Sequence, residues 1–377
     1  MAMHRKGAKV LQIGNYPPPL CGWAIQTVLV EEELRRRGQI CKVLKINENR
    51  EVKSPEYIDV QGGADYLYKV VRHALAGYRI NVHVNGQSKK GYFLALAAMG
   101  VARLTFRPAL LTFHGGLAQQ YFPRHDSTRL HWAFKLLFLL SNAIACDSDE
   151  IKRAIIEYGV NPESVTSIAT FSPQYVEFET AALSGEIEEF LRNHNPVFFS
   201  YVSFRPEYRL EVLREGMNRF RQAYSKAGFI WLGFPGKEYP LAEEQVSGWP
   251  EGERQSLLLL GNLSHQEFLT LMTRCTACLR TPACDGVSAS VKEALALGIP
   301  VVASENGRRP AGVITYDEFD SEDMSARLTF VVENYDNIRR QIHVEAGEDN
   351  IALMADWLTG ETAARSHSEA VGARTGD

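Results

Sequence analysis

The sequence predicts an α/β protein with two halves, each built on a parallel β-sheet flanked by helices. With 377 residues, the chain is long for one core and suffices for two domains of roughly 150 to 190 residues each. Short apolar runs alternate with longer helix-like segments through both halves, which is the pattern of repeated β-α-β units. Many of these runs end in glycine or a polar residue, as strands do at the edge where parallel sheets bind ligands.

The composition is that of an ordinary globular protein, with 45% hydrophobic and 23% charged residues. Residues 1–9 carry basic side chains but lead only into the short apolar run 10–13, so we expect no secretory signal. The longest apolar runs, 91–102 and 136–145, fall short of the ~20 residues that a membrane span needs.

Six cysteines stand at positions 21, 41, 146, 275, 278 and 284. Cys275 and Cys278 have the spacing of half a zinc site and Cys284 follows them, but no second Cys or His pair completes the set. We expect reduced, buried thiols and no metal, and reduced thiols predict a cytoplasmic location.

The charge is distributed unevenly along the chain. Residues 1–170 hold 22 Lys and Arg against 14 Asp and Glu, while the remainder holds 19 against 31. The basic half could favour an anionic membrane surface or an anionic acceptor, or the asymmetry could be chance on solvated faces. No RNA-binding motif and no long basic run occurs, so a nucleic-acid partner is not expected.

The first half opens with a β-α-β unit. Lys9 to Ile13 predicts a buried strand, a proline-rich loop runs from Gly14 to Gly22, and a helix follows from about Trp23 to Arg37. Cys41 to Ile46 predicts the next strand. The loop lies at the carboxyl edge of the sheet, where Gly22 would let the backbone approach a phosphate.

Two further strands, Ile80–Val84 and Ala109–Phe113, come next in this half. The second leads directly into His114-Gly-Gly, so we expect His114 to lie over the ligand edge of the sheet. His83, inside the preceding strand, is expected to be a hydrogen-bonded core residue.

Residues 129–140 predict a helix with basic and aromatic residues at one end. It could lie on a membrane interface, but we favour a buried helix flanking the sheet. A strand at 143–146, a helix at 148–158 and a strand at 165–169 complete the first half, and 170–190 is expected to cross to the second.

The second half repeats the alternation. Strands are predicted at 196–202, 229–232, 257–260 and 275–280, with helices at 210–228 and 265–273. The strands end at Ser203, Gly233, Gly261 and Asp285, which should share one edge of a parallel sheet and form a ligand site there. Helices at 324–340 and 350–358 and a frayed tail from 359 complete the chain.

The segment 281–304 is the most informative part of the sequence. Asp285 and Glu293 stand eight residues apart, across a junction between a loop and a predicted helix over 287–297. The N-terminus of that helix would present free N–H groups to hydroxyl or phosphate oxygens, and Glu293 lies about two turns along it. Gly298 fits a helix C-cap and Pro300 precedes a buried strand.

This segment resembles the carboxylate-x7-carboxylate signature of the family 4 retaining glycosyltransferases, in which the helix ends in Gly-x-Pro-Val-Val-Ala. The resemblance covers roughly residues 8–345 and implies that Asp285 lies beside the donor sugar, while Glu293 binds the ribose hydroxyls of the nucleotide. The first acid is usually Glu in the family, and here it is Asp285. The loop 14–22 resembles the family's Gly-x-x-Pro-Pro-x-x-Gly-Gly loop, with Cys21 in place of the first paired glycine.

The same resemblance implies roles for other residues. A histidine at the position of His114 can contact the donor sugar, Arg205 and Arg209 best match the basic residues that neutralise the diphosphate, and Gly261 to Ser264 matches the turn that reads the nucleobase. The implied catalytic residues are Asp285, His114 and Glu293. The implied donor-binding residues are Gly22, Arg205, Arg209, Gly233, Gly261, Asn262, Leu263, Gly286, Val287, Ser288 and Glu293.

The resemblance implies the GT-B fold, with two Rossmann-like domains facing across a central cleft. We expect an acceptor-side domain over 1–180, a nucleotide-sugar-binding domain over 190–345, and a C-terminal helix and tail over 346–377 whose helix crosses back to the first domain. The implied activity is metal-independent, retaining transfer of a sugar from a nucleotide-sugar donor to a glycan or lipid-linked acceptor, without a cofactor. Such enzymes act in bacterial polysaccharide or envelope glycan biosynthesis, with possible peripheral contact with the inner membrane.

Two alternatives remain open on the sequence alone. The shortened Asp285, the single Gly22 and the loosely matched basic loop would suit a non-catalytic sugar-nucleotide-binding or scaffold protein. An epimerase on the same fold would need a constellation of acids that the sequence does not reveal.

Overall fold

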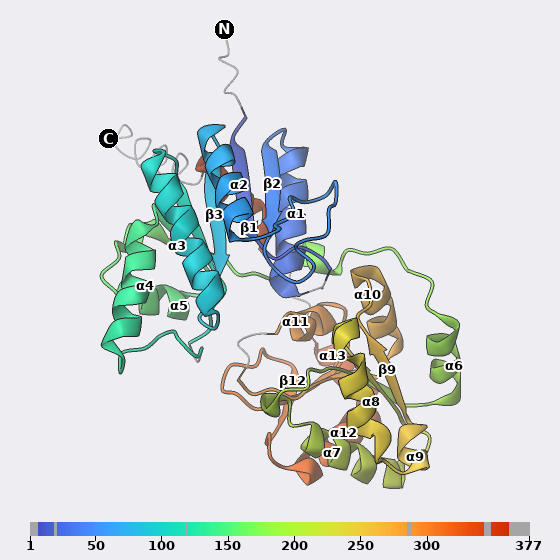
Figure 1. Cartoon of the computed structure of the whole chain (residues 1–377). Helices are drawn as coiled ribbons and strands as arrows, with labels where there is room; N and C mark the ends of the chain where they lie inside the picture. The colour runs from blue at the N-terminus through green and yellow to red at the C-terminus, as the bar shows by residue number, and fades with distance from the viewer. Residues whose placement is uncertain (1–6, 19–20, 118, 285–287, 343–347, 362–377) are drawn as a thin grey trace, which may run out of the picture. The chain divides into compact units, whose positions relative to one another are not determined.

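The computed structural model describes residues 7–18, 21–117, 119–284, 288–342 and 348–361 (Figure 1). The chain divides into two compact units. Unit 1 comprises Met1–Gln174 and Glu348–Asp377, and unit 2 comprises Tyr175–Gly347. Each unit contains a parallel six-stranded sheet.

Unit 1 has the strand order β2-β1-β3-β4-β5-β6, with every neighbouring pair parallel. The chain runs from β1 to β2 on one side and then returns to β3 on the other side of β1. This reversal is the topological switch point, at which doubly wound sheets bind ligands. The strands are β1 (Lys9–Gly14), β2 (Ile40–Lys45), β3 (Arg79–Val84), β4 (Ala109–Phe113), β5 (Ala143–Cys146) and β6 (Val165–Ser167).

Helices connect these strands because apolar residues recur on one face of each segment and cover the sheet. The helices of unit 1 are α1 (Gly22–Arg36), α2 (Gly63–Leu75), α3 (Lys89–Leu104), α4 (Thr128–Leu140), α5 (Asp149–Ile156) and α14 (Asn350–Thr359), with 3₁₀ turns at Pro162–Ser164 and Pro173–Val176. Ser88, Ser127 and Ser148 cap α3, α4 and α5 through their hydroxyl oxygens.

Helix α4 is half buried. Phe134, Leu137 and Phe138 pack into the core, while Trp132 and Leu136 are exposed on the other face. It therefore flanks the sheet with one apolar face uncovered. None of the helices in the described ranges is long and apolar enough to cross a membrane.

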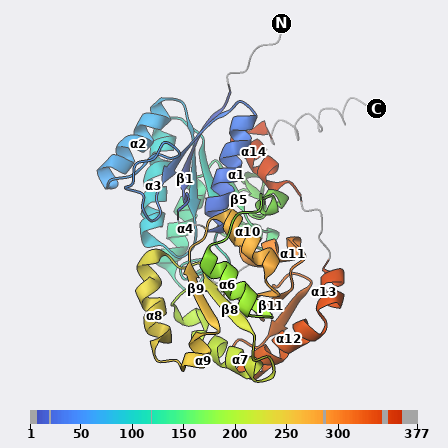
Figure 2. The same cartoon turned by 90° about the vertical axis from the view of Figure 1, so that its right-hand side faces the viewer.

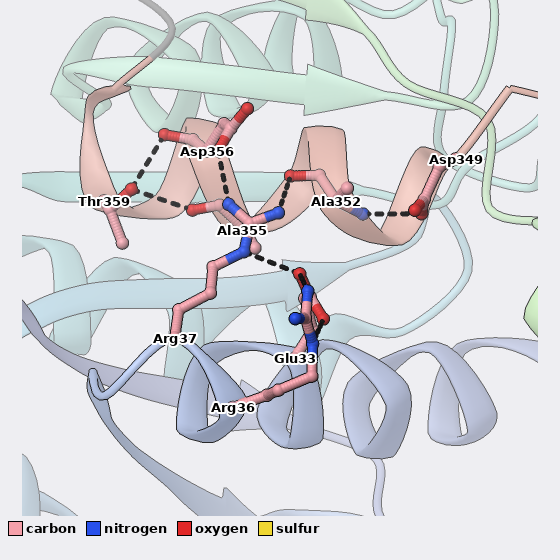
Figure 3. A network of polar contacts seen from close by, with 8 residues as sticks. All are labelled: Glu33, Arg36, Arg37, Asp349, Ala352, Ala355, Asp356 and Thr359. Atoms are coloured by element: carbon pink, nitrogen blue, oxygen red, sulfur yellow. Dashed lines mark hydrogen bonds and ion pairs between the residues drawn. The ribbon is translucent and has the colours of Figure 1, made fainter.

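The C-terminal helix α14 returns to unit 1 and lies beside α1 (Figure 2). Arg37, just after α1, forms ion pairs with Glu33 at 2.6 Å and with Asp356 of α14, and it also donates to the Ala352 carbonyl (Figure 3). At the start of α14, the Asn350 amide donates to the Phe171 carbonyl at 2.7 Å. These contacts fasten the end of the described chain to unit 1.

Unit 2 has the strand order β12-β11-β10-β7-β8-β9, again entirely parallel. Its switch point lies between β7 and β10. The strands are β7 (Val197–Tyr201), β8 (Gly228–Leu232), β9 (Leu257–Gly261), β10 (Ala277–Arg280), β11 (Val301–Ser304) and β12 (Val313–Tyr316). The helices are α6 (Gly185–Asn193), α7 (Leu210–Ala223), α8 (Tyr239–Ser247), α9 (Glu251–Arg254), α10 (His265–Arg274), α11 (Ala289–Ala296), α12 (Ser321–Glu333) and α13 (Tyr335–Gln341), with 3₁₀ turns at Pro206–Tyr208 and Gly236–Glu238.

Several segments differ from the sequence-based prediction. The expected crossover 170–190 already contains the start of α6, because Ser184 accepts a hydrogen bond from Ile187 N–H and caps that helix. The helix predicted over 324–340 is two helices, since α12 ends and α13 begins at Asn334. Helices α2, α3, α8 and α9 and strand β12 were not predicted.

Candidate functional site

The carboxylate at Glu293 is buried in unit 2. Glu293 lies on α11 and is 2% exposed. Its Oε1 accepts a hydrogen bond from His265 Nε2 at 2.9 Å. His265 is the first residue of α10, and Ser264 and Glu267 form a capping box at that helix start. The residue that directly follows the turn predicted to read the nucleobase is therefore hydrogen bonded to Glu293.

Sequence reasoning missed His265. It lies 28 residues from Glu293, and only its position right after the predicted turn could have drawn attention to it. Asp285, Gly286 and Val287 lie outside the described residues. Ser288 is described and stands at the N-cap position of α11, with its hydroxyl 3.0 Å from that of Ser290.

The two arginines expected to neutralise a diphosphate are both engaged with acids. The Arg205 side chain is 58% exposed and lies 3.4 Å from Glu207. Arg209 has a left-handed backbone with φ of 47°, lies 3.5 Å from Glu318 and stacks on Phe319. Their predicted role remains a prediction.

Two other arginines, which were not predicted as site residues, lie at the carboxyl edge of this sheet. Arg280 ends β10 and is buried; it donates to the Tyr201 carbonyl at 3.1 Å, across the switch point between β10 and β7. Arg309 donates to the carbonyls of Ser304 and Pro282 at 2.8 and 2.9 Å. In the sequence, only its position at the end of a short apolar strand could have drawn attention to Arg280.

The glycines after β8 and at the end of β9 have defined backbone roles. Gly233 has φ of +91°, and a Cβ there would lie 2.3 Å from the Tyr201 ring. Its N–H donates to the carbonyl of Gly261, which has φ of +61°. Packing and backbone conformation thus require glycine at 233. Asn262 and Leu263 continue directly from Gly261 toward the α10 cap.

In unit 1, Lys45 at the end of β2 holds the proline-rich loop. Its ammonium donates to the carbonyls of Pro17 and Pro18 at 3.2 and 2.7 Å and lies over the Tyr57 ring. Burial lowers the pKa of Lys45. Gly22 is the first residue of α1 and follows this loop, with Cys21 at the N-cap position.

Five strand ends bring a polar cluster together at the carboxyl edge of unit 1. Gly14 ends β1 so close to His83 of β3 that a Cβ at Gly14 would lie 2.9 Å from the imidazole. His83 Nδ1 is 3.0 Å from Nε2 of His114, which follows β4. Beyond His114 lie Asp147, after β5, and Thr170, after β6.

His83 and His114 were predicted to have different roles, and their surroundings differ as well. His83 is buried and hydrogen bonded, which confirms the expectation of a satisfied core residue, and burial lowers its pKa well below the usual value. His114 does lie at the sheet edge, but its side chain is only 6% exposed, with His83 on one ring nitrogen and Thr170 and Asp147 near the other. The Trp23 ring also covers it, at a centroid distance of 4.9 Å. His114 therefore has little hydrogen-bonding capacity left for a ligand.

The cysteines are free thiols. Burial raises the pKa of Cys278 to about 12 and also raises that of Cys275, which keeps both protonated. Over the described ranges, no group of three His, Cys, Asp or Glu side chains is arranged to hold a metal ion.

Comparisons with known sequence families and with curated proteins found no match to this sequence. Solved structures match over nearly the whole chain. HepE of Anabaena, in complex with UDP-glucose, has a TM-score of 0.67 at 15% identity, covering 94% of this chain and 99% of that chain. A glycosyltransferase from Rickettsia africae has a TM-score of 0.62 at 13% identity, covering 96% and 98% respectively. The UDP-GlcNAc 2-epimerase of Neisseria meningitidis, bound to UDP-GlcNAc, has a TM-score of 0.61 at 13% identity, covering 94% and 100%.

The fold is GT-B. The predicted fold class is thus confirmed, with one Rossmann-like parallel sheet in each unit. At these identities the likeness establishes the fold and leaves the reaction open.

Proposed function

We propose that the protein is a retaining, metal-independent glycosyltransferase of the family 4 type, moving a sugar from a nucleotide-sugar donor to a glycan or lipid-linked acceptor. The observation that carries the proposal is the hydrogen bond between the buried Glu293 and His265, which joins the resemblance segment to the residue directly after the predicted base-binding turn. HepE, solved with UDP-glucose, and the Rickettsia glycosyltransferase support it as structural neighbours. Bacterial polysaccharide or envelope glycan synthesis at the cytoplasmic membrane face is the setting we propose.

Unit 2 would bind the nucleotide. Glu293 would accept hydrogen bonds from the ribose hydroxyls, and the N–H of His265 would keep its carboxylate oriented although it is buried. Arg205 and Arg209 would exchange their contacts with Glu207 and Glu318 for the diphosphate.

The chemistry would be carried by positioning and by charge stabilisation. Positive charge would develop on the sugar as its bond to the phosphate breaks, and Asp285 would lie beside that sugar. The departing phosphate oxygen would take the proton of the acceptor hydroxyl on the same face, which retains the anomeric configuration. Basic side chains and helix N-termini would stabilise the leaving group.

Two other functions remain candidates for specific reasons. The Neisseria epimerase shares the fold, so an epimerase is one, and it would convert the donor sugar without any acceptor. The single Gly22 and the Asp at 285 favour the other, a scaffold that binds nucleotide-sugars without turnover. Product analysis after incubating donor alone, and donor with candidate acceptors, separates the three.

The test of nucleotide binding is a thermal-shift titration with UDP-, GDP-, dTDP- and CMP-sugars in the presence of EDTA. One base series should stabilise the wild-type protein, by about 2.7 kcal/mol when its concentration is 100 times the Kd. Glu293→Gln should weaken that binding roughly 10- to 100-fold, because a charged acceptor of ribose hydroxyls is lost.

Glu243→Gln, at an exposed glutamate of α8, is the matched control and should bind like the wild type. Unchanged affinity in Glu293→Gln would refute the ribose assignment. No stabilisation by any nucleotide-sugar would refute the donor site as a whole. Retention is read separately, from the anomeric configuration of the product by NMR.

A further inference from the structure

A continuous chain of hydrogen-bonding groups crosses the carboxyl edge of the sheet in unit 1. It passes from Asn81 through His83, His114 and Thr170 to Asp147, with neighbouring groups 2.5–3.5 Å apart. Its second member, His83, lies beside Gly14, at the switch point between β1 and β3, where sheets of this topology bind ligands.

The hydrogen bonds from Asn81 to His114 have a defined direction. The Thr112 hydroxyl donates to Asn81 Oδ1 at 3.0 Å, which turns the Asn81 amide N–H toward His83 Nε2 at 3.1 Å. His83 is neutral, because burial lowers its pKa, so an accepting Nε2 places its proton on Nδ1. Gln12 Oε1, the competing acceptor at Nε2, is farther away at 3.3 Å. His83 Nδ1 therefore donates to His114 Nε2 at 3.0 Å.

The hydrogen bonds from His114 to Asp147 continue in the same direction. With Nε2 accepting, His114 carries a proton on Nδ1, which faces Thr170 Oγ1 at 3.5 Å and Asp147 Oδ1 at 3.7 Å. The Thr170 hydroxyl donates to the same Oδ1 at 2.5 Å. Both contacts thus converge on one oxygen of Asp147 and leave Oδ2 on the other side of the carboxylate.

Asp147 is more accessible than the two histidines of this network. Its side chain is 30% exposed, against 6% for His114. It does not serve as the cap of α5, because Ser148 Oγ already accepts from Ile151 N–H at 3.3 Å. No lysine or arginine in the described ranges forms an ion pair with it. A carboxylate held this way at a ligand edge, close to a helix N-terminus that favours its charge, is prepared to accept hydrogen bonds.

We propose that Asp147 is a saccharide-binding residue of unit 1, whose Oδ2 accepts a hydrogen bond from a hydroxyl of the acceptor. His83, His114 and Thr170 are positioning residues that orient the carboxylate and do not touch the ligand. The inference rests on the proposed function for the identity of the ligand, and it assigns the first acceptor contact to a named atom.

The direction of the chain is tested by NMR on protein labelled with ¹⁵N-histidine, using long-range ¹H–¹⁵N spectra to read the tautomers. We expect the proton on Nδ1 and an accepting Nε2 in both His83 and His114. Thr170→Val, which keeps the shape but removes the hydroxyl, should change the His114 signals, and Thr170→Ser should restore them. An Nε2–H tautomer at His83, or identical spectra for the valine and serine variants, would overturn the proposed direction of these hydrogen bonds.

The binding role is tested with Asp147→Asn, using methyl α-D-glucopyranoside and methyl α-D-mannopyranoside at millimolar concentrations as probes. Either glycoside should shift the His114 signals of the wild-type protein and leave those of Asp147→Asn unchanged. Asp149→Asn, at an exposed aspartate of α5, should respond like the wild type. In a transfer assay, Asp147→Asn should raise the acceptor KM roughly tenfold or more with donor affinity unchanged.

The two proposals fail in different ways. An unaltered acceptor KM in Asp147→Asn, or no response of wild-type His114 to either glycoside, would overturn the role of Asp147 even if nucleotide binding depends on Glu293. Loss of nucleotide binding in Asp147→Asn would also overturn it, since the side chain would then act on the fold as a whole. Failure of the proposed function would be seen instead in wild-type protein that binds no nucleotide-sugar.

Discussion

Replacing His83 with glutamine should make the stability of unit 1 less sensitive to acid. His83 is buried among Asn81, Gln12 and His114, and burial, with a smaller contribution from His114, lowers its pKa well below the usual value. In the unfolded chain its pKa returns to about 6.5. The unfolded state therefore binds more protons below that pH. The contribution of the neutral His83 to the stability of unit 1 is thus complete above about pH 6.5 and is lost as the pH falls.

The size of the effect follows from one proton. Each pH unit below about 6.5 lowers the unfolding free energy by up to about 1.4 kcal/mol. Lowering the pH from about 7.5 to about 5.5 should therefore lower it by about 1.4 kcal/mol through His83. Other groups titrate in this window. Glu31, whose pKa is raised to about 7 by burial, acts in the opposite direction, because it takes up a proton in the folded state. These contributions are common to both proteins and cancel in the difference between wild type and His83→Gln.

The assay must resolve the two units, because a global signal would mix two unfolding transitions. Urea unfolding followed by pulsed hydrogen exchange and mass spectrometry, on peptides from β3 and β4, reports on unit 1 alone. The unfolding free energy of wild-type protein should fall by about 1.4 kcal/mol more than that of His83→Gln between about pH 7.5 and 5.5. Equal losses in the two proteins would refute the reasoning, since His83 would then be titrating alike in the folded and unfolded states.

Two further predictions concern packing in each unit. Gly233→Ala should destabilise unit 2 by roughly 2–4 kcal/mol in urea unfolding, because the new Cβ would meet the Tyr201 ring and the backbone has positive φ. Gly236→Ala, at a glycine with open space around its Cβ position, is the control. Similar losses of stability in both variants would contradict the packing argument. Arg37→Ala should loosen α14, with its amides exchanging roughly 10- to 100-fold faster, since the contacts to Asp356 and the Ala352 carbonyl are lost. Arg36→Ala, at a side chain that is 73% exposed and pairs with Glu33, should have little effect, and equal acceleration in both variants would count against this role.

Much of the fold could be predicted from the sequence because its elements are encoded locally. The apolar run Ala109–Phe113 became β4, and the helix predicted over 287–297 is α11, Ala289–Ala296, followed by Gly298 with φ of +70°. Short-range signals also placed His114 at a strand end and Glu293 on a helix. The break at Asn334 was missed, because two adjoining helices keep a nearly continuous helical pattern across it.

The sequence by itself determined the two α/β halves, the strand ends that carry polar residues and the position of Glu293 on its helix, because apolar periodicity and glycine placement act over a few residues. Only the tertiary structure decided the partners of those residues. Glu293 meets His265 from 28 positions away, His114 meets His83 from 31 and Thr170 from 56, and Asp356 meets Arg37 from 319. These contacts depend on the order of strands within each sheet and on the return of α14, which bring together segments that no local pattern relates.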